Sequence, residues 1–220
     1  MCEYKQTPDV LLSAECIVRF KVQQQFSLIK KVVPSCASMR TLSQILLYEG
    51  RCAQVYWKVY ASRLPVWVGF TSRKVKRDDG VNRLLNIGYH HLNNVVTKIL
   101  STHNVSPVLG FMHKARTEKS KPLVYDLMEL FRADLVDREV LRFFRLKKKP
   151  VIHINQSDIG MFLKRLNHRM ERKIYIKEFK QCHTYRYMME LQILKCISAV
   201  NHKEVFRPFD VPKRHESRCS

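Results

Sequence analysis

Apolar residues recur at intervals of three or four positions along most of the chain, which is the spacing of one face of a helix. The pattern predicts a helix over residues 11–33 that Pro34 ends, and a second over residues 39–62. The clearest stripe runs from Val81 to Ile99. Three further helices are expected over residues 123–146 with a break near Ala133, 157–170 with Ser157 as N-cap, and 178–200.

The composition agrees with this helical pattern. The chain contains only 6 glycines and 8 prolines in 220 residues, which argues against a fold of many short strands and tight turns. No fixed-period repeat, low-complexity tract or interdomain linker interrupts the pattern. We therefore expect an all-α fold with one multi-helix domain over residues 11–208, a leader over residues 1–10 and a polar tail over residues 209–220.

The charge balance indicates the kind of partner. Lys and Arg number 40 against 19 Asp and Glu, which gives a formal net charge of +21. Such a charge favours a polyanion, most often nucleic acid and less often an acidic membrane surface. No apolar run reaches the ~18 residues of a membrane-spanning helix, and the seven cysteines form no C-x-x-C pair, which indicates reduced thiols. We expect a cytoplasmic protein that does not cross a membrane.

Glu49 breaks the apolar pattern of its helix. It lies four residues after Ile45 and four before Ala53, on the apolar stripe. A carboxylate on such a face is costly unless a partner neutralises it. A structural salt bridge and a metal-binding or catalytic role are equally good interpretations.

Three further residues are chemically notable. Asp126 and Glu129 stand three apart and share one face of a helix; this spacing suits a divalent cation, although such pairs are more often solvated. His113 follows an apolar stretch, where a histidine is usually a packed residue. Taken together with Glu49, they form an N/O donor set for Mg²⁺ or Mn²⁺ in a polyanion-binding chain. Spacing alone does not show that the segments meet.

Four segments, in order, resemble motifs of one family, the CRISPR-associated integrase/endonuclease of spacer acquisition. Residues 49–57 are similar to its E-G-x-x-A-x-x-Y-W helix, and residues 80–89 to its P-V-N-x-L-L-N-Y-G-Y segment. Residues 107–113 resemble P-x-x-G-F-L-H, and residues 123–132 resemble L-V-Y-D-L-M-E-P-F-R. The similarity extends over nearly the whole chain. Two positions depart from the family pattern. Leu130 stands where the family usually has Pro, and Asp79-Gly80 stands in place of its usual Asp-Pro.

The resemblance implies a set of site residues. Glu49, His113 and Glu129 match the catalytic metal ligands, for Mg²⁺ or Mn²⁺, and Asp126 matches a catalytic carboxylate that supports them. Further matches are the aromatic residues Tyr89 and Tyr125 near the active site, the phosphate-contacting Arg132, and Asn82, which fixes local helix packing.

The resemblance also implies an activity and partners. Family members join the 3′-hydroxyl of a short DNA, the prespacer, to a phosphodiester at the CRISPR repeat, and the same site acts as a nuclease. They form homodimers and associate with a small ferredoxin-like partner of the same locus. An N-terminal β-rich domain usually precedes the helical catalytic domain, and we expect this chain to lack it.

Two basic stretches are candidate DNA contacts. The preferred one is the loop carrying Arg73, Lys74, Lys76 and Arg77; the stretch over residues 138–149 is as readily a solvated helix end. Two alternatives to a CRISPR integrase stay open. The first alternative is a truncated, catalytically inactive DNA-binding protein. The second is the integrase of a mobile element.

Overall fold

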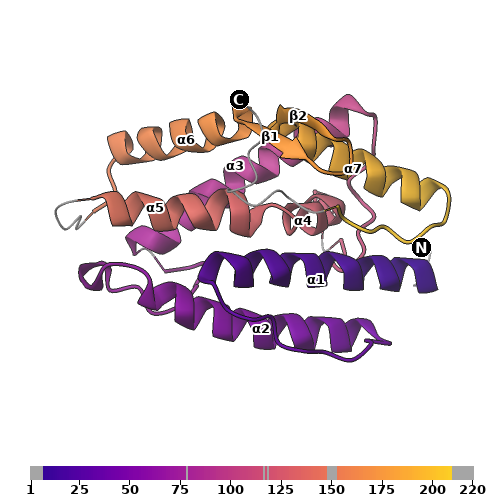
Figure 1. Ribbon diagram of the computed structural model, residues 1–220, viewed down its shortest axis with the longest axis horizontal. Coiled ribbons are helices and arrows are strands. Elements are labelled where there is room, and N and C mark those ends of the chain that lie inside the picture. The colour runs from indigo at the N-terminus through magenta and orange to yellow at the C-terminus, as the bar shows by residue number, and fades with distance from the viewer. Residues whose placement is uncertain (1–6, 78, 116, 118, 148–152, 210–220) are drawn as a thin grey trace.

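The computed structural model describes residues 7–77, 79–115, 117, 119–147 and 153–209, and their fold is all-α, as expected (Figure 1). One two-stranded hairpin is added to the helices. The elements in chain order are α1 (Pro8–Ile29), α2 (Leu42–Ser62), the 3-10 turn η1 (Val66–Val68), α3 (Gly80–Thr102), α4 (Pro122–Met128), the π-helix η2 (Arg132–Asp137), α5 (Arg138–Leu146), α6 (Gln156–Glu171), β1 (Lys173–Ile176), β2 (Gln181–Thr184) and α7 (Tyr185–Asn201).

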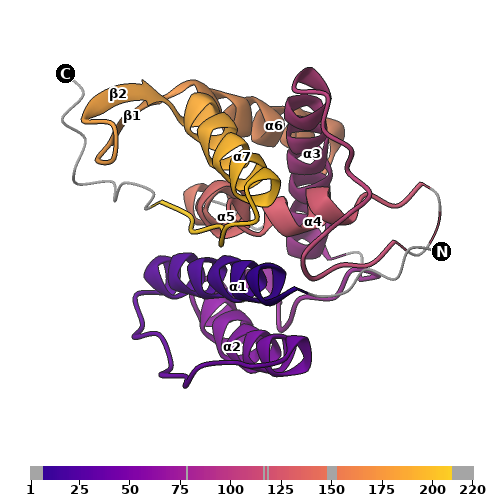
Figure 2. The ribbon, with the colours of Figure 1, turned by 90° about the vertical axis from the view of Figure 1, so that its right-hand side faces the viewer.

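The helices are arranged in layers. α1 and α2 pack against one another and form the lower layer of Figure 1, and α5 lies between that layer and α6 in both ribbon views (Figures 1 and 2). The short π-helix η2 sits at the centre, where it contacts α1, α3, α5 and α6. Its Leu135 and Val136 are buried among apolar side chains from all of these helices.

Close approach between α3 and η2 depends on a glycine. A Cβ atom built on Gly88 would lie 2.4 Å from Cγ1 of Val136 and 3.2 Å from Cζ of Phe162. No side chain fits in that space, so Gly88 lets the backbone of α3 pack directly against η2 and α6. This explains why a glycine interrupts the clearest apolar stripe in the sequence.

Helix ends differ from the sequence-based predictions at two places. α1 ends at Ile29, before Pro34, because Lys30 adopts a left-handed conformation with φ of 52° and its N–H donates to the carbonyls of Phe26 and Ser27. The N-cap of α6 is Asn155 and not Ser157. Asn155 and Asp158 form a reciprocal capping box that the prediction overlooked.

The segment over residues 123–146 is broken, as predicted, but earlier than Ala133. Turns at Glu129–Phe131 separate α4 from η2. In η2 the N–H of Arg138 donates to the carbonyl of Ala133, five residues earlier, which is the π-helical pattern. Because a π-helical turn contains more residues than an α-helical turn, the side chains of Arg132–Asp137 point in other directions than in a regular α-helix.

The predicted start of the last helix at residue 178 is wrong. β1 and β2 pair there as an antiparallel hairpin, with Lys173 opposite Thr184, and α7 starts at Tyr185 with the Thr184 side chain as its cap. The short apolar run Ile174–Ile176 does not by itself distinguish a strand from a helical turn.

The cysteines only partly match expectation. Cys16, Cys36, Cys52 and Cys196 are free thiols, whereas Cys182 is disulfide-bonded, so the prediction of reduced thiols is wrong there. Sequence spacing does not reveal which cysteines a fold brings together. In the described part of the chain, no helix is both long enough and apolar enough to cross a membrane.

Candidate active site

A buried lysine joins the two predicted glutamate ligands. Nζ of Lys21, on α1, lies 2.5 Å from Oε1 of Glu49, on α2, and 2.7 Å from Oε2 of Glu129, at the C-cap of α4. Lys21 is 8% exposed and Glu129 is 4% exposed. Two carboxylates from distant parts of the sequence therefore converge on one cationic atom.

Glu129 is held between two cations. Its other oxygen, Oε1, accepts a hydrogen bond of 2.6 Å from Arg132, one turn further along the chain. Burial disfavours the carboxylate, but the charges of Arg132 and Lys21 outweigh burial and lower the pKa of Glu129. Attraction to Glu129 and Glu49 likewise raises the pKa of Lys21 despite its burial. Lys21 and Glu129 therefore form an ionised pair at neutral pH.

A second pair orients the predicted histidine ligand. Nδ1 of His113 lies 2.5 Å from Oδ1 of the fully buried Asp126. Oδ2 of Asp126 accepts hydrogen bonds from the backbone N–H groups of Phe111 and Met112, with N···O distances of 2.5 and 3.0 Å. The hydrogen bond to Asp126 raises the pKa of His113 despite burial. The carboxylate fixes the ring from one side, which leaves Nε2 as the other ring nitrogen for a ligand or proton.

Gly110 makes this arrangement possible. A Cβ atom at Gly110 would lie 2.6 Å from Oδ2 of Asp126 and 2.9 Å from the carbonyl oxygen of His113. The loop therefore wraps tightly around the Asp126 carboxylate only because residue 110 has no side chain. This gives a physical reason for the glycine in the segment before His113.

The residues Lys21, Glu49, Glu129 and Arg132 form one group, here called the acidic cluster. Tyr89 connects this cluster to the basic loop that carries Arg73. The guanidinium groups of Arg132 and Arg73 lie over its ring, 4.8 and 5.4 Å from the centroid. Its hydroxyl donates to Oδ1 of Asp137 at 2.6 Å, and Oδ2 of Asp137 accepts from Tyr56 at 2.7 Å. Burial raises the pKa of Asp137 to about 6, although both tyrosine hydrogen bonds oppose the shift.

The basic loop is held to α3 by Arg73, whereas the side chains that follow it are exposed to solvent. Arg73 donates to the side-chain oxygens of Asn82 and Asn86 at 2.9 and 2.6 Å. The buried Asn82 also accepts from the backbone N–H of Lys74. The side chains of Lys74, Lys76 and Arg77 are exposed, and Arg77 pairs with Asp79 at 3.3 Å.

The predicted residues thus form two linked groups. Glu49 and Glu129 meet at Lys21, and His113 meets Asp126, while the charge of His113 also lowers the pKa of Glu129. The solvated-face interpretation of Asp126 and Glu129 is wrong, because both carboxylates are buried. Tyr125 is 39% exposed and contacts the edge of the His113 ring. Within the described residues, Lys74 and Lys76 form no ion pair with Glu49 or Glu129, whereas Arg73 lies over the Tyr89 ring beside Arg132.

Lys21 and Asp137 are site residues that were not predicted from the sequence. Lys21 stands four residues after Ile17 and one before Val22, on the buried face of α1. It was therefore detectable by the argument that singled out Glu49, a charge on an apolar stripe. Asp137 gave no such signal, since the π-helix alters which face it occupies.

The residues suit a divalent cation in type. Two carboxylates already face one cationic atom, and the histidine has a carboxylate behind it, as metal-binding histidines usually do. Within the described residues, no three His, Cys, Asp or Glu side chains are close enough together to form a ready-made site. The Lys21 ammonium holds the position between the two glutamates.

Comparison with known proteins identifies relatives. The chain is 37% identical over 110 residues to CRISPR-associated endonuclease Cas1 1 of Saccharolobus solfataricus, an alignment covering 49% of this chain and 31% of that one. It spans 31% to 53% of the length of the first curated Cas1 relatives that it matches. The alignments therefore cover about a third to a half of the length of these relatives.

Two solved structures share the fold. A casposase bound to its integration product superposes with a TM-score of 0.76 at 18% identity, covering 96% of this chain and 65% of that one. A Cas6-RT-Cas1–Cas2 complex also gives a TM-score of 0.76, at 19% identity over 95% of this chain and 26% of that one. The family model of CRISPR associated protein Cas1 matches residues 12–181. The chain belongs to the Cas1 family, and its helices correspond to the catalytic domain.

Proposed function

We propose that this chain is a metal-dependent DNA endonuclease and integrase of CRISPR spacer acquisition, which joins a DNA 3′-hydroxyl to a target phosphodiester. One observation carries the proposal. Two glutamates from α2 and α4 converge on a single cationic atom, next to a histidine that a buried carboxylate orients. Family membership supports the same activity.

Each residue of the cluster has a role in this proposal. Glu49, Glu129 and His113 would hold Mg²⁺ or Mn²⁺, which supplies Lewis-acid activation of the phosphodiester and the attacking hydroxyl. Asp126 keeps His113 in one orientation. Arg132 favours the ionised form of Glu129, and its guanidinium, which lies over Tyr89, would bind a phosphate oxygen of the DNA.

Lys21 has two parts in this scheme. Without the divalent cation its ammonium neutralises Glu49 and Glu129 and keeps them together. With the cation bound, a positive charge would no longer be needed between them. Lys21 would then be released to interact with a phosphate of the substrate.

The partners follow from the relatives. The casposase structure contains an integration product, and the complex with the Cas6-RT-Cas1 chain contains Cas2. By analogy we propose prespacer and CRISPR-repeat DNA as substrates, a small Cas2-type protein as partner, and assembly as a homodimer. The net charge of +21 supports DNA as the main ligand.

A mobile-element integrase is the second candidate. The casposase has this fold and would use the same chemistry, so the fold does not separate the two. Substrate choice does: a CRISPR integrase prefers a repeat-containing target. An inactive DNA-binding protein is the third reading, and it requires no metal.

Strand transfer on a labelled branched DNA tests the proposal. Wild type should form product with Mg²⁺ or Mn²⁺ and none with a chelator. Asp126→Asn should reduce the rate by about 10–100-fold, as for the loss of a group that orients a ligand, and Glu129→Gln should reduce it further. DNA binding by both variants should persist.

The matched control is Glu178→Gln, which removes an exposed carboxylate paired with Lys195 at 2.9 Å. It should act like wild type. Circular dichroism verifies that each variant is folded. Metal-independent joining, or joining by Glu129→Gln at the wild-type rate, would contradict the assignment of the site.

A further inference from the structure

A basic groove lies between α5 and α6, apart from the acidic cluster. It encloses about 370 Å³, and the residues that line it are Glu139, Arg142, Met161, Lys164, Arg165, His168, Arg169 and Arg172. None of them belongs to the cluster around Lys21. α6 lies on the side of α5 that faces away from α1 and α2 (Figures 1 and 2).

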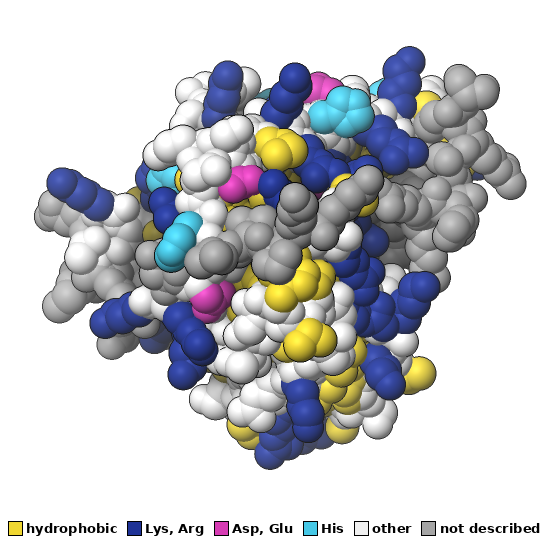
Figure 3. Space-filling view, turned by 90° about the vertical axis from the view of Figure 1, so that its left-hand side faces the viewer, with side chains coloured by type: hydrophobic (Ala, Val, Ile, Leu, Met, Phe, Trp, Pro, Cys, Tyr) yellow, Lys and Arg dark blue, Asp and Glu magenta, His cyan; other side chains and the backbone are white. Residues whose placement is uncertain are grey.

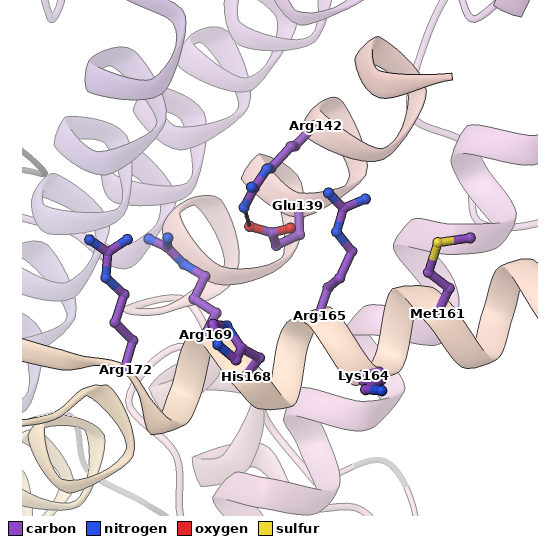
Figure 4. A pocket seen from close by; sticks show the side chains of 8 residues that line it. All are labelled: Glu139, Arg142, Met161, Lys164, Arg165, His168, Arg169 and Arg172. Atoms are coloured by element: carbon purple, nitrogen blue, oxygen red, sulfur yellow. Dashed lines mark ion pairs between the residues drawn. The ribbon is translucent and has the colours of Figure 1, made fainter. Parts of the chain in front are cut away.

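The groove concentrates guanidinium groups from two helices. Arg165 and Arg169 of α6 and Arg172 at its C-cap extend toward α5, and Arg142 extends from α5 toward Glu139 (Figure 4). Arg165 and Arg169 stand at i and i+4 of α6 and share one helix face, and Arg172, three residues further on, is the C-cap of the helix. At about 1.5 Å per residue they span roughly 10 Å.

Few carboxylates neutralise these cations. Arg169 pairs with Asp134 at 2.7 Å, and Arg142 lies 3.6 Å from Glu139, which is a loose contact. Lys164, Arg165 and Arg172 have no ion pair with any carboxylate of the described residues. Lys and Arg side chains are also spread over the face of the molecule in Figure 3, where Asp and Glu are few.

Two buried atoms in the groove lack partners. Nε of Arg169 and Oε2 of Glu139 are buried and form no hydrogen bond with the described residues. A buried polar atom without a partner is costly unless water or a ligand satisfies it. A basic surface that served only solubility would be convex and solvated, whereas this one is concave with unsatisfied groups.

We propose that the α5–α6 groove binds consecutive backbone phosphates of a DNA strand at a second site. Phosphates follow one another at about 3.4 Å of axial rise along a strand, so the roughly 10 Å between Arg165 and Arg172 corresponds to about three phosphate-to-phosphate steps. Guanidinium groups bind phosphates in a bidentate manner. The inference deepens the proposed function, because it assumes a DNA substrate that reaches from the acidic cluster to this groove.

The test measures DNA binding as a function of salt. Fluorescence anisotropy of a labelled oligonucleotide, single-stranded in one arm and duplex in another, is recorded with Arg165→Gln/Arg172→Gln and with wild type. Losing two phosphate contacts should reduce the slope of log K against log salt by about 1.4 for a single strand or about 1.8 for a duplex. The variant Arg165→Lys/Arg172→Lys should retain most of the slope.

The control is Lys98→Gln/Lys203→Gln, which removes the same charge from exposed positions outside the groove. An equal change in slope for this control and the groove variant would overturn the proposal. Loss of inorganic-phosphate binding with unchanged DNA binding would overturn it as well. A strand-transfer assay separates failure of the groove proposal from failure of the proposed function. If the slope changes as expected but the wild-type protein does not join DNA, the groove proposal is supported and the proposed function is contradicted.

Discussion

At the residue scale, Lys21 performs a task that usually belongs to a metal. Its ammonium stands between two carboxylates that repel one another when the counter-charge is removed. The glutamates are therefore held together by a cation of the protein itself. The acidic cluster is built into the fold and does not depend on a ligand for its formation.

Lys21→Met should destabilise the protein by about 2 kcal/mol. This is less than the loss for a fully buried ion pair, because the Glu49 side chain is 28% exposed. Mn²⁺ should restore part of the lost stability in the variant, since it supplies the missing charge. Urea unfolding with and without Mn²⁺ measures both effects, and Lys31→Met, at an exposed position just after α1, is the control.

Asp137→Asn should change the pH dependence of stability. The pKa of Asp137 rises from 3.8 to about 6 on burial, so the folded state holds the proton more tightly than the unfolded state. Its ionisation therefore lowers wild-type stability as pH increases from about 4 to about 6, by about 3 kcal/mol in all. Asp137→Asn should not lose this stability with increasing pH, because an asparagine side chain does not ionise.

Urea unfolding of both proteins between pH 4 and pH 7 provides the measurement. Titrations of Glu129 and His113 are common to both proteins and cancel in the difference. The stability of the variant relative to wild type should rise across the interval. A difference that stays constant with pH would show that Asp137 keeps an ordinary pKa.

Much of the site could be predicted from individual residues, and some could not. Glu49 was detectable because a carboxylate interrupts an apolar stripe, and Asp126 and Glu129 because their spacing places them on one face. Which of these carboxylates meets which partner depends on how α1, α2 and α4 pack. No local pattern contains that information, so the pairing of Lys21 with Glu49 and Glu129 could not be predicted, although Lys21 itself stands out as a charge on an apolar stripe.

At the element scale, the π-helix η2 explains why the region after Glu129 resisted prediction. Its wider turn directs Asp134 toward Arg169 of α6 and Asp137 toward the tyrosines of α2 and α3. A regular 3.6-residue periodicity would not place both carboxylates in contact with these partners. The apolar pattern predicted the break in this helix, but not its form.

Two glycine substitutions should have opposite effects on stability. Gly88→Ala forces a Cβ atom against Val136, and overpacking of this kind costs about 1–3 kcal/mol. Gly50, inside α2, has no atom within 4 Å of a Cβ, so Gly50→Ala should stabilise the helix by about 0.5–1 kcal/mol. Thermal unfolding compares the two, and a loss of stability for both would show that helix packing is not the cause.

At the scale of the whole molecule, distant parts of the chain are fastened together. The backbone N–H of Phe206 donates to Oγ of Ser13 at 2.9 Å, and both residues are buried. Gln192 exchanges two hydrogen bonds with the backbone of Phe209. The segment after α7 therefore closes over α1, the helix that carries Lys21.

Phe206→Ala should cost about 3–5 kcal/mol, because it leaves a cavity in a closed core. Phe179→Ala, at a side chain that is 42% exposed, is the matched control and should cost less than half as much. Urea unfolding gives both values. Equal losses would indicate that the segment after α7 does not contribute to the core.

The packing of α1 has a consequence for protein synthesis. The buried face of α1 rests on η2, which lies on the order of 100 residues later in the sequence. A ribosome therefore releases α1 well before η2 exists, and the part of α1 that packs against η2 stays uncovered in the growing chain until then. A chain interrupted before Glu129 retains α2 against α1 but lacks both η2 and the second glutamate at Lys21, so the site and the centre of the core are completed by the same segment.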